Sequence, residues 1–257
     1  MIIDTHAHLF FDDIKKDITE VVERAIEQGI VKIIVPALDL KTSEEILKLS
    51  EEHEIIYAAI GFHPSDVKDA ELKDIKILEE LSAHKKVVAI GEIGLDYYWN
   101  KDNMTEQRSF FREQLELAKD KTLPVIIHTR NSIKDALQII GDAYDNRLKG
   151  QFHCFSGDEN DMKEIFKLND FYVSFCGNIT FKNFKHKELI KKTPVEKLLS
   201  ETDSPFLTPE PFRGKRNEPS RIVYTIKKMA ELKNMNYDEL LKTLYENAER
   251  LFFNSNT

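Results

Sequence analysis

The sequence predicts an α/β protein with one domain, residues 1–257, built as a closed barrel of eight parallel strands. Short runs of β-branched and aromatic residues alternate along the chain with longer amphipathic runs, and such alternation indicates parallel strands joined by right-handed helical crossovers. Eight strand–helix units in 257 residues average about 32 residues each, the size of one βα unit. The simplest arrangement is a TIM-like (β/α)8 barrel. A doubly wound open sheet has the same periodicity and is the alternative.

Eight short runs are predicted to be strands because each is apolar at most positions, as a strand buried on both faces requires. The first run is very short, and the last is assigned mainly from its place in the order of strands and helices. The predicted strands are residues 2–3, 33–35, 55–60, 87–90, 125–127, 151–155, 171–175 and 197–199.

Helices are predicted where apolar residues recur at helical spacing between the strands. Residues 13–28 carry such an apolar stripe, and Gly29 is expected to end that helix. Thr42, with Glu45 three residues later, is expected to open the next helix as a capping box. The remaining helices are predicted at residues 74–83, 105–119, 132–144, 159–167, 186–192, 219–233 and 238–253.

The composition is that of a globular protein, with 41% hydrophobic and 32% charged residues. A net charge of −8 argues against a broad basic surface for duplex DNA, although a short basic channel for a single strand remains compatible with it. The sequence shows no signal peptide and no apolar run of about 20 residues, so we expect a cytoplasmic protein. Cys154 and Cys176 are too few for a disulfide framework and are expected to be small, buried, reduced side chains.

Polar side chains are concentrated where the predicted strands end. Because the carboxyl ends of all strands in a barrel meet at one face, side chains that are far apart in the sequence are expected to converge on one mouth. The segments concerned are residues 4–8, 91–94, 128–130, 153–157 and 201–205.

Histidines and carboxylates at these strand ends form a candidate site for Zn²⁺, Mn²⁺ or Fe²⁺. His6 and His8 are two residues apart, so a strand places both rings on one side, where they can share an ion that Asp203 completes. Each residue also has a structural interpretation by itself, since a histidine can simply be hydrogen-bonded and Asp203 can cap a turn. Four of the eight histidines fall at predicted strand ends, each beside a carboxylate or another histidine of the proposed site, and this coincidence favours the metal interpretation.

Glu92 is the candidate bridge to a second ion, which His128 and His153 would also bind. Taken alone, Glu92 between two glycines is equally typical of a solvated turn. Two divalent ions about 3.5–4 Å apart can hold the attacking and leaving oxygens of an in-line displacement, and they lower the pKa of a water toward about 7. The sequence therefore predicts two divalent metal ions. Catalytic roles are expected for Glu92 and for Asp203, which can orient the water or take its proton.

Two candidate substrate-binding residues lie close to these ligands in the sequence. His63 follows the third predicted strand and either faces the mouth or only stabilises its own turn; we favour the mouth. Arg130 lies two residues beyond His128 and can point into the same mouth. The aromatic residues 97–99 can stack on exposed bases or can equally pack over the barrel rim.

A basic cluster supplies the other substrate-binding candidates. Lys215 and Arg216, with Arg213 and Arg221 nearby, follow the last predicted strand in a chain that is otherwise acidic. One interpretation is a clamp on substrate phosphates. The other is a solvated loop with ordinary charges. The position of the cluster after a strand that carries a candidate ligand favours the clamp.

Seven segments of the sequence, taken together, resemble the TatD family of metal-dependent hydrolases. They occur in family order, and the set is specific although each segment alone is weak. The segments are DTHAHL at 4–9, GFHP at 61–64, GEIGLDYY at 91–98, LPVIIHTR at 123–130, FHCFSG at 152–157, ETDSPFLTP at 201–209 and RGKRNEPS at 213–220.

The resemblance implies a TIM-like barrel with one or two metal ions and deoxyribonuclease activity, often 3′→5′ on single strands. It implies that Mg²⁺ or Mn²⁺ supports activity. The residue types themselves add Zn²⁺ or Fe²⁺ as candidates for the bound metal. Related dinuclear barrels use a carboxylated lysine as the bridging ligand, whereas Glu92 takes that position here. The implied ligands of one ion are His6, His8, Glu92 and Asp203, and those of the other are Glu92, His128 and His153.

The sequence is compatible with three functions. The first is a deoxyribonuclease of the 3′→5′ exonuclease type on single-stranded or frayed DNA, which the acidic net charge and a deep mouth favour. The second is an ester or amide hydrolase such as an aminoacyl-tRNA deacylase, since the same activated hydroxide attacks a carbonyl. The third is a non-catalytic nucleic-acid-binding or scaffold protein on a structural metal, which an open, shared ligand set disfavours. We expect a monomer with no obligate protein partner and no membrane association.

Overall fold

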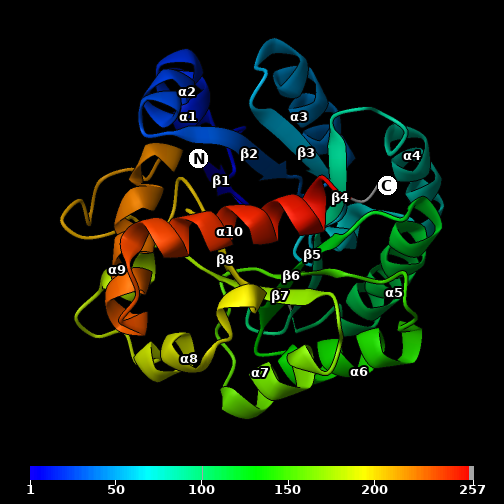
Figure 1. Cartoon of the computed structure of the whole chain (residues 1–257). Coiled ribbons are helices and arrows are strands. Elements are labelled where there is room, and N and C mark those ends of the chain that lie inside the picture. Colours follow the sequence, from blue (N-terminus) through cyan, green and yellow to red (C-terminus); the bar gives the residue numbers. More distant parts are fainter. Residues whose placement is uncertain (100, 255–257) are drawn as a thin grey trace.

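Eight parallel strands form the centre of the computed structural model, which describes residues 1–99 and 101–254. The strands are hydrogen-bonded in sequence order, from β1 to β8, and Figure 1 shows the helices arranged around them. Residue 100 and the last three residues of the predicted domain 1–257 lie outside the described residues. The strands are β1 Ile2–Asp4, β2 Ile30–Pro36, β3 Ile56–Ile60, β4 Val87–Asp96, β5 Val125–Arg130, β6 Gly150–Phe152, β7 Phe171–Phe175 and β8 Leu198–Ser200.

Contacts between the first and last strands close the sheet into a barrel. The Thr5 N–H donates to the Ser200 carbonyl over 3.3 Å. Beyond the strand ends, Ala7 and Ser204 form an isolated parallel bridge, and the His8 N–H donates to the Ser204 carbonyl over 2.7 Å. The predicted closed (β/α)8 barrel is therefore confirmed, and the open doubly wound sheet is excluded.

Every predicted helix is present, with differences at the ends. The predicted helix 13–28 is two helices, because Asp17 between them has non-helical dihedral angles, φ −138° and ψ 35°. Among the described residues, no helix is both long enough and apolar enough to cross a membrane. The helices are α1 Asp12–Lys15, α2 Ile18–Glu27, α3 Leu40–Glu52, α4 Ile75–Leu81, α5 Met104–Lys121, α6 Ile133–Ala143, α7 Glu159–Phe166, α8 Lys187–Lys192, α9 Ile222–Lys233 and α10 Tyr237–Phe252, with single 3₁₀ turns η1 Val67–Asp69, η2 Leu72–Asp74, η3 Gly177–Thr180, η4 Val195–Lys197 and η5 Pro219–Arg221.

The capping box of α3 begins earlier than predicted. The side chain of Asp39 accepts a hydrogen bond from the Thr42 N–H over 2.7 Å, and the Thr42 hydroxyl accepts one from the Asp39 N–H over 2.9 Å. Thr42 therefore completes a box that Asp39 opens, and the prediction that Thr42 opens it with Glu45 was wrong. Aspartate is as good an N-cap as serine or threonine, so both readings were compatible with the sequence.

β4 continues well past its predicted end at residue 90. Gly94 pairs with His128 and Asp96 with Arg130 on β5, so Glu92 and His128 lie within strands rather than after them. Gly94 has a φ of 131°, and a Cβ there would lie 2.1 Å from the His128 carbonyl oxygen. Only glycine fits this position, which lets the two strands run together up to the site.

β6, in contrast, ends at Phe152 and is shorter than the predicted strand 151–155. His153 and Cys154 therefore begin the following loop, and Cys154 has a φ of 41°. The expectation of two buried cysteines is right for Cys176 and wrong for Cys154, which is only partly buried.

α10 crosses over one end of the barrel (Figure 1). Buried strand residues that include Ile3, Ile34 and Leu199 form an apolar cluster with Leu251 and Phe252 at the end of this helix. A larger apolar cluster packs the strands against the surrounding helices. Because apolar side chains and α10 fill this end, the polar residues at the carboxyl ends of the strands occupy the other end.

We expect Gly94→Ala to lower the free energy of unfolding by roughly 2–4 kcal/mol, because the added Cβ meets the His128 backbone and the positive φ strains any other residue. Urea unfolding measures the change. The matched control is Gly141→Ala on α6, where a Cβ meets no atom within 4 Å. This control should be neutral or stabilising by up to about 1 kcal/mol. Equal stability of the two variants would contradict the pairing of β4 with β5 at Gly94.

Candidate metal centre

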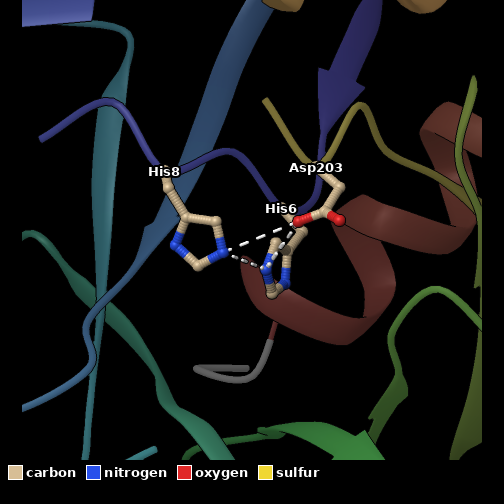
Figure 2. A group of neighbouring side chains, drawn as sticks. All are labelled: His6, His8 and Asp203. Atoms are coloured by element: carbon tan, nitrogen blue, oxygen red, sulfur yellow. Dashed lines mark hydrogen bonds and ion pairs between the residues drawn. The ribbon is translucent and has the colours of Figure 1, made fainter. Parts of the chain in front are cut away.

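Backbone pairing between the first and last strands brings two histidines and an aspartate together. His6 and His8 follow β1, and the Asp203 N–H donates to the His6 carbonyl over 2.9 Å, which fixes Asp203 beside them. The Nε2 atoms of His6 and His8 are 3.1 Å apart. Asp203 Oδ1 is 3.7 Å from His6 Nε2 and 3.6 Å from His8 Nε2. Figure 2 shows both rings and the carboxylate turned toward one another, so these three side chains can share one cation.

Glu92, on β4, turns its two carboxylate oxygens toward different histidines. Oε2 is 3.4 Å from His6 Nε2 and 3.5 Å from His8 Nε2. Oε1 is 2.8 Å from His128 Nδ1 and 2.9 Å from His153 Nε2. One carboxylate thus stands between two pairs of imidazoles, which is the arrangement that a bridging ligand needs.

The second pair of imidazoles comes from β5 and from the loop after β6. His128 Nδ1 and His153 Nε2 are 3.2 Å apart. His63, after β3, lies at the same place, with Nε2 3.6 Å from Glu92 Oε1 and its ring edge-on to that of His128. All six predicted ligand residues are therefore brought together, and His63 joins them at the mouth rather than only stabilising its turn.

The buried donor set fits divalent cations. The side chain of His6 is 0% exposed and that of Glu92 3%, so water does not solvate them in place of a cation. The Nδ1 atoms of His6 and His8 have no hydrogen-bond partner among the residues that the structure describes. Each ring therefore lacks a hydrogen bond at Nδ1, while its Nε2 atom lies close to the carboxylate oxygens of Glu92 and Asp203. Imidazole nitrogen with carboxylate oxygen is a donor set for Zn²⁺, Mn²⁺ and Fe²⁺.

The electrostatics of the first group favour neutral side chains before a cation binds. Burial, followed by the neighbouring imidazole of His6, holds the pKa of His8 well below its usual value. Burial raises the pKa of Asp203 to about 8. At neutral pH this group therefore contains neutral imidazoles with free lone pairs and a carboxyl group that keeps its proton.

The second group instead holds opposite charges. Burial opposes the charged form of His153, but the carboxylates of Glu92 and Glu201 outweigh it and raise the pKa of His153 well above its usual value. Burial likewise opposes the ionisation of Glu92, yet the neighbouring histidines, His153 first, hold its pKa well below its usual value. A proton on His153 therefore compensates Glu92 at the position where a cation would do so.

Three buried carboxylates that support the site were not predicted. Glu201 accepts hydrogen bonds from the Cys154 N–H and the Ser174 hydroxyl, each over 2.7 Å, and lies 3.5 Å from His153 Nδ1. Asp96 Oδ2 is 3.2 Å from His128 Nε2. Asp4 accepts a hydrogen bond of 2.6 Å from the Thr202 hydroxyl, and burial raises its pKa to about 7. A carboxylate hydrogen-bonded to a ligand histidine, as Asp96 is to His128, orients the ring. No local sequence pattern indicates these roles, because each carboxylate meets partners on other segments of the chain.

A cavity of about 460 Å³ opens above the two groups of ligands. Arg130 lines it, as predicted, and its guanidinium carbon lies 4.5 Å from the centre of the Tyr98 ring and 5.3 Å from that of Trp99. Tyr98 and Trp99 are 50% and 65% exposed. Tyr97 is buried, and its hydroxyl donates a hydrogen bond to the Asp135 carboxylate. Of the three aromatics, only the last two are available at the rim.

The basic cluster lies at a neighbouring cavity of about 510 Å³. Both cavities are lined by Phe206 and Leu207, so they adjoin. Lys215 is exposed at the second cavity. Arg216 also reaches it, but its guanidinium donates to both carboxylate oxygens of Asp17, over 2.6 and 2.7 Å. The geometry therefore leaves Lys215 freer than Arg216 to bind an anion.

The whole chain is similar to known metal-dependent hydrolases. A model of the family described as TatD related DNase matches residues 3–253. The chain is 47% identical to the uncharacterized metal-dependent hydrolase YabD of Bacillus subtilis (strain 168), over 98% of this chain and 99% of that protein. It is 32% identical to the uncharacterized metal-dependent hydrolase YcfH of Escherichia coli (strain K12), over 98% and 95%. Its fold is similar to the crystal structure of YjjV, a TatD homolog from Escherichia coli K12, with a TM-score of 0.92 and 32% identity over 98% of this chain and 97% of that chain.

The affinity for Mn²⁺ should increase with pH. Asp203, with a pKa of about 8, and His153, with a raised pKa, hold protons at neutral pH that must leave before these groups bind a cation. Between about pH 6 and pH 8 we expect roughly a tenfold gain per pH unit for each proton displaced. Calorimetric titration of the metal-free protein measures this slope.

Asp203→Asn is the matched variant for that titration, because the amide keeps the shape of the side chain and carries no titrating proton. Its slope should be lower by one proton than that of the unaltered protein. A Mn²⁺ affinity that is independent of pH in this window would contradict the assigned ligands.

Proposed function

Since the chain belongs to the TatD-related DNase family of metal-dependent hydrolases, we propose that it is a deoxyribonuclease. We infer that it cleaves phosphodiester bonds of single-stranded or frayed DNA from the 3′ end. The observation that carries the proposal is the position of Glu92, whose two oxygens lie 2.8–3.5 Å from nitrogens of four histidines. Such a ligand set suits two neighbouring divalent cations, for which Mg²⁺ or Mn²⁺ is our proposal in turnover and Zn²⁺ or Fe²⁺ a further possibility as bound metal.

Divalent cations, when bound, supply Lewis acidity that activates a water and offsets the charge on a phosphodiester undergoing attack. His6, His8 and Asp203 would hold one cation, His128 and His153 the other, and Glu92 both. Asp203 is the residue suited to move a proton. It faces the cavity, and once cation binding has displaced its own proton, its ionised carboxylate can accept one from water.

The walls of the cavity suit a single strand. Trp99 and Phe206, 65% and 49% exposed, line the cavity over the ligands and offer faces on which unpaired bases can stack. Arg130 beside Trp99 offers a cation for the phosphate backbone. Lys215 in the adjoining cavity offers a second. A duplex would need a broad basic surface, which a chain of net charge −8 does not favour.

A metal-dependent ester or amide hydrolase, such as an aminoacyl-tRNA deacylase, is the second candidate. The observation that favours it is the ion pair of Arg216 with Asp17, which removes one of the two predicted phosphate contacts. We retain the deoxyribonuclease as the first proposal because Lys215 and Arg130 remain available. A cytoplasmic location and a monomeric state also stay predictions.

We expect the purified protein with Mn²⁺ or Mg²⁺ to shorten a 5′-labelled single-stranded oligonucleotide, and EDTA to stop it. Glu92→Ala should lower kcat/KM by about 1,000-fold or more, since it removes a ligand shared by both proposed cations. Glu44→Ala, an exposed carboxylate of α3, is the control and should be fully active. Hydrolysis of an aminoacyl-tRNA with no cleavage of the oligonucleotide would overturn the proposal in favour of the second candidate.

Lys215→Ala should raise the KM for single-stranded DNA roughly three- to tenfold with little change in kcat, because an exposed phosphate contact contributes about 1 kcal/mol to binding. Arg216→Ala should raise it less, because Arg216 is held by Asp17. Steady-state kinetics measure both effects, with Lys41→Ala on α3, also an exposed lysine, as the control. A KM that is the same for Lys215→Ala and Lys41→Ala would show that the cluster does not bind substrate.

A further inference from the structure

The two cysteines of the chain meet at the ends of neighbouring strands. Cys154 follows β6 and Cys176 follows β7, and these strands pair in parallel with Phe152 opposite Val173. Both side chains are free thiols, and their Sγ atoms are 2.9 Å apart. A disulfide has an S–S bond of about 2.05 Å, so the two sulfurs need to approach each other by only about 0.9 Å to become bonded.

The two thiols differ in how easily a reagent reaches them. Cys176 is buried, and burial raises the pKa of its thiol well above the usual value. Cys154 is partly exposed. A cavity of about 330 Å³ lies beside the pair, lined by Phe155, which follows Cys154, and by Asn178, whose amide oxygen accepts a weak hydrogen bond of 3.6 Å from the Cys176 thiol. A small oxidant would therefore meet Cys154 first.

We propose that Cys154 and Cys176 are a redox-active dithiol that closes to a reversible disulfide beside the metal centre and weakens cation binding there. The oxidant is a low-molecular-weight disulfide. The Cys154 sulfur attacks one reagent sulfur, the reagent S–S bond breaks, and the departing thiolate takes the Cys154 proton. The Cys176 sulfur then bonds to the Cys154 sulfur, and the second reagent thiolate leaves with the Cys176 proton. Two protein thiols are oxidised to one disulfide, and one reagent disulfide is reduced to two thiols.

A metal site is the other chemistry that this cluster suggests, because Cys154, Cys176 and Glu201 lie close enough to share an ion. Two observations favour the disulfide. Two thiolates on one tetrahedral Zn²⁺, each at about 2.3 Å, are separated by roughly 3.8 Å, well beyond the 2.9 Å found here. The carboxylate of Glu201 is already engaged by the Cys154 N–H, the Ser174 hydroxyl and the Gln151 amide, each over 2.7 Å.

Two links connect Cys154 to the metal centre: its peptide bond to His153 and the hydrogen bond from its N–H to Glu201. Cys154 directly follows His153 in the chain, and its N–H donates to Glu201 Oε1 over 2.7 Å. The same oxygen is 3.5 Å from His153 Nδ1. The other ring nitrogen of His153, Nε2, faces Glu92. Cys154 also has a φ of 41°, a left-handed conformation that residues other than glycine rarely adopt. Drawing its sulfur toward Cys176 therefore displaces a backbone already held in one strained position, and with it the carboxylate that lies within ion-pair distance of His153.

Thiol counting tests the disulfide in the full chain. The protein is incubated with oxidised glutathione, quenched in acid, denatured, labelled with N-ethylmaleimide and weighed by mass spectrometry. The unaltered protein should carry no N-ethylmaleimide label and no bound glutathione, because both thiols have formed the disulfide. Treatment with dithiothreitol should make both thiols available for labelling again. Cys176→Ser should carry one glutathione on Cys154, whereas Cys154→Ser should keep its buried thiol.

Two labelled thiols, or a stable glutathione adduct on the unaltered protein, would overturn the proposal. So would thiols protected before treatment and released by a chelator rather than a reductant, since that result indicates a metal site.

Mn²⁺ titration of the reduced and the oxidised protein tests the coupling without any substrate, so its outcome is independent of whether the protein cleaves DNA. Disturbing a carboxylate that orients a ligand histidine typically costs 10–100-fold in metal affinity, and we expect a loss of about tenfold on oxidation that dithiothreitol reverses. Cys154→Ser given the same treatment should show no change. Equal affinity of the oxidised and reduced forms of the unaltered protein would contradict the proposal.

Discussion

The two oxygens of Glu92 face different pairs of histidines, and this division of one carboxylate places demands on several elements of the barrel. β4 must extend far enough to present Glu92 beside His128 on β5, which the glycine at position 94 permits because its lack of a Cβ lets the strands approach. β1 must meet the segment after β8, so that Asp203 stands beside His6 and His8. The chain closes into a barrel at the same contacts. The contacts that close the barrel therefore also bring Asp203 beside His6 and His8.

Because the side chains of the site are buried, their protonation depends strongly on the charges next to them. Removing a carboxylate and several imidazoles from water is unfavourable unless opposite charges, hydrogen bonds or a cation compensate. The protein supplies part of the compensation itself, through Glu201 beside His153 and Asp96 beside His128. What remains is a raised pKa at Asp203 and at His153, so protons occupy positions that a divalent cation can take. The proposed dithiol adjoins this network through the Cys154 N–H.

The sequence was sufficient to predict the barrel and the residues that gather at its mouth, because strand–helix alternation and the chemistry of strand ends are local patterns. It was insufficient where distant segments decide the outcome. Glycines on either side of Glu92 resemble a turn, and only pairing with β5 shows that the strand continues. Arg216 looked like a free phosphate ligand, whereas Asp17, 199 residues away in the chain, holds it. The buried roles of Glu201 and Asp96 depend on contacts that no local pattern encodes.

Anomalous diffraction from crystals of the Mn²⁺-loaded protein tests the central role of Glu92 most directly. We expect two anomalous peaks about 3.5–4 Å apart, one beside His6, His8 and Asp203 and the other beside His128 and His153, with an oxygen of Glu92 bound to each. A single peak, or two peaks of which one has no contact with Glu92, would contradict it.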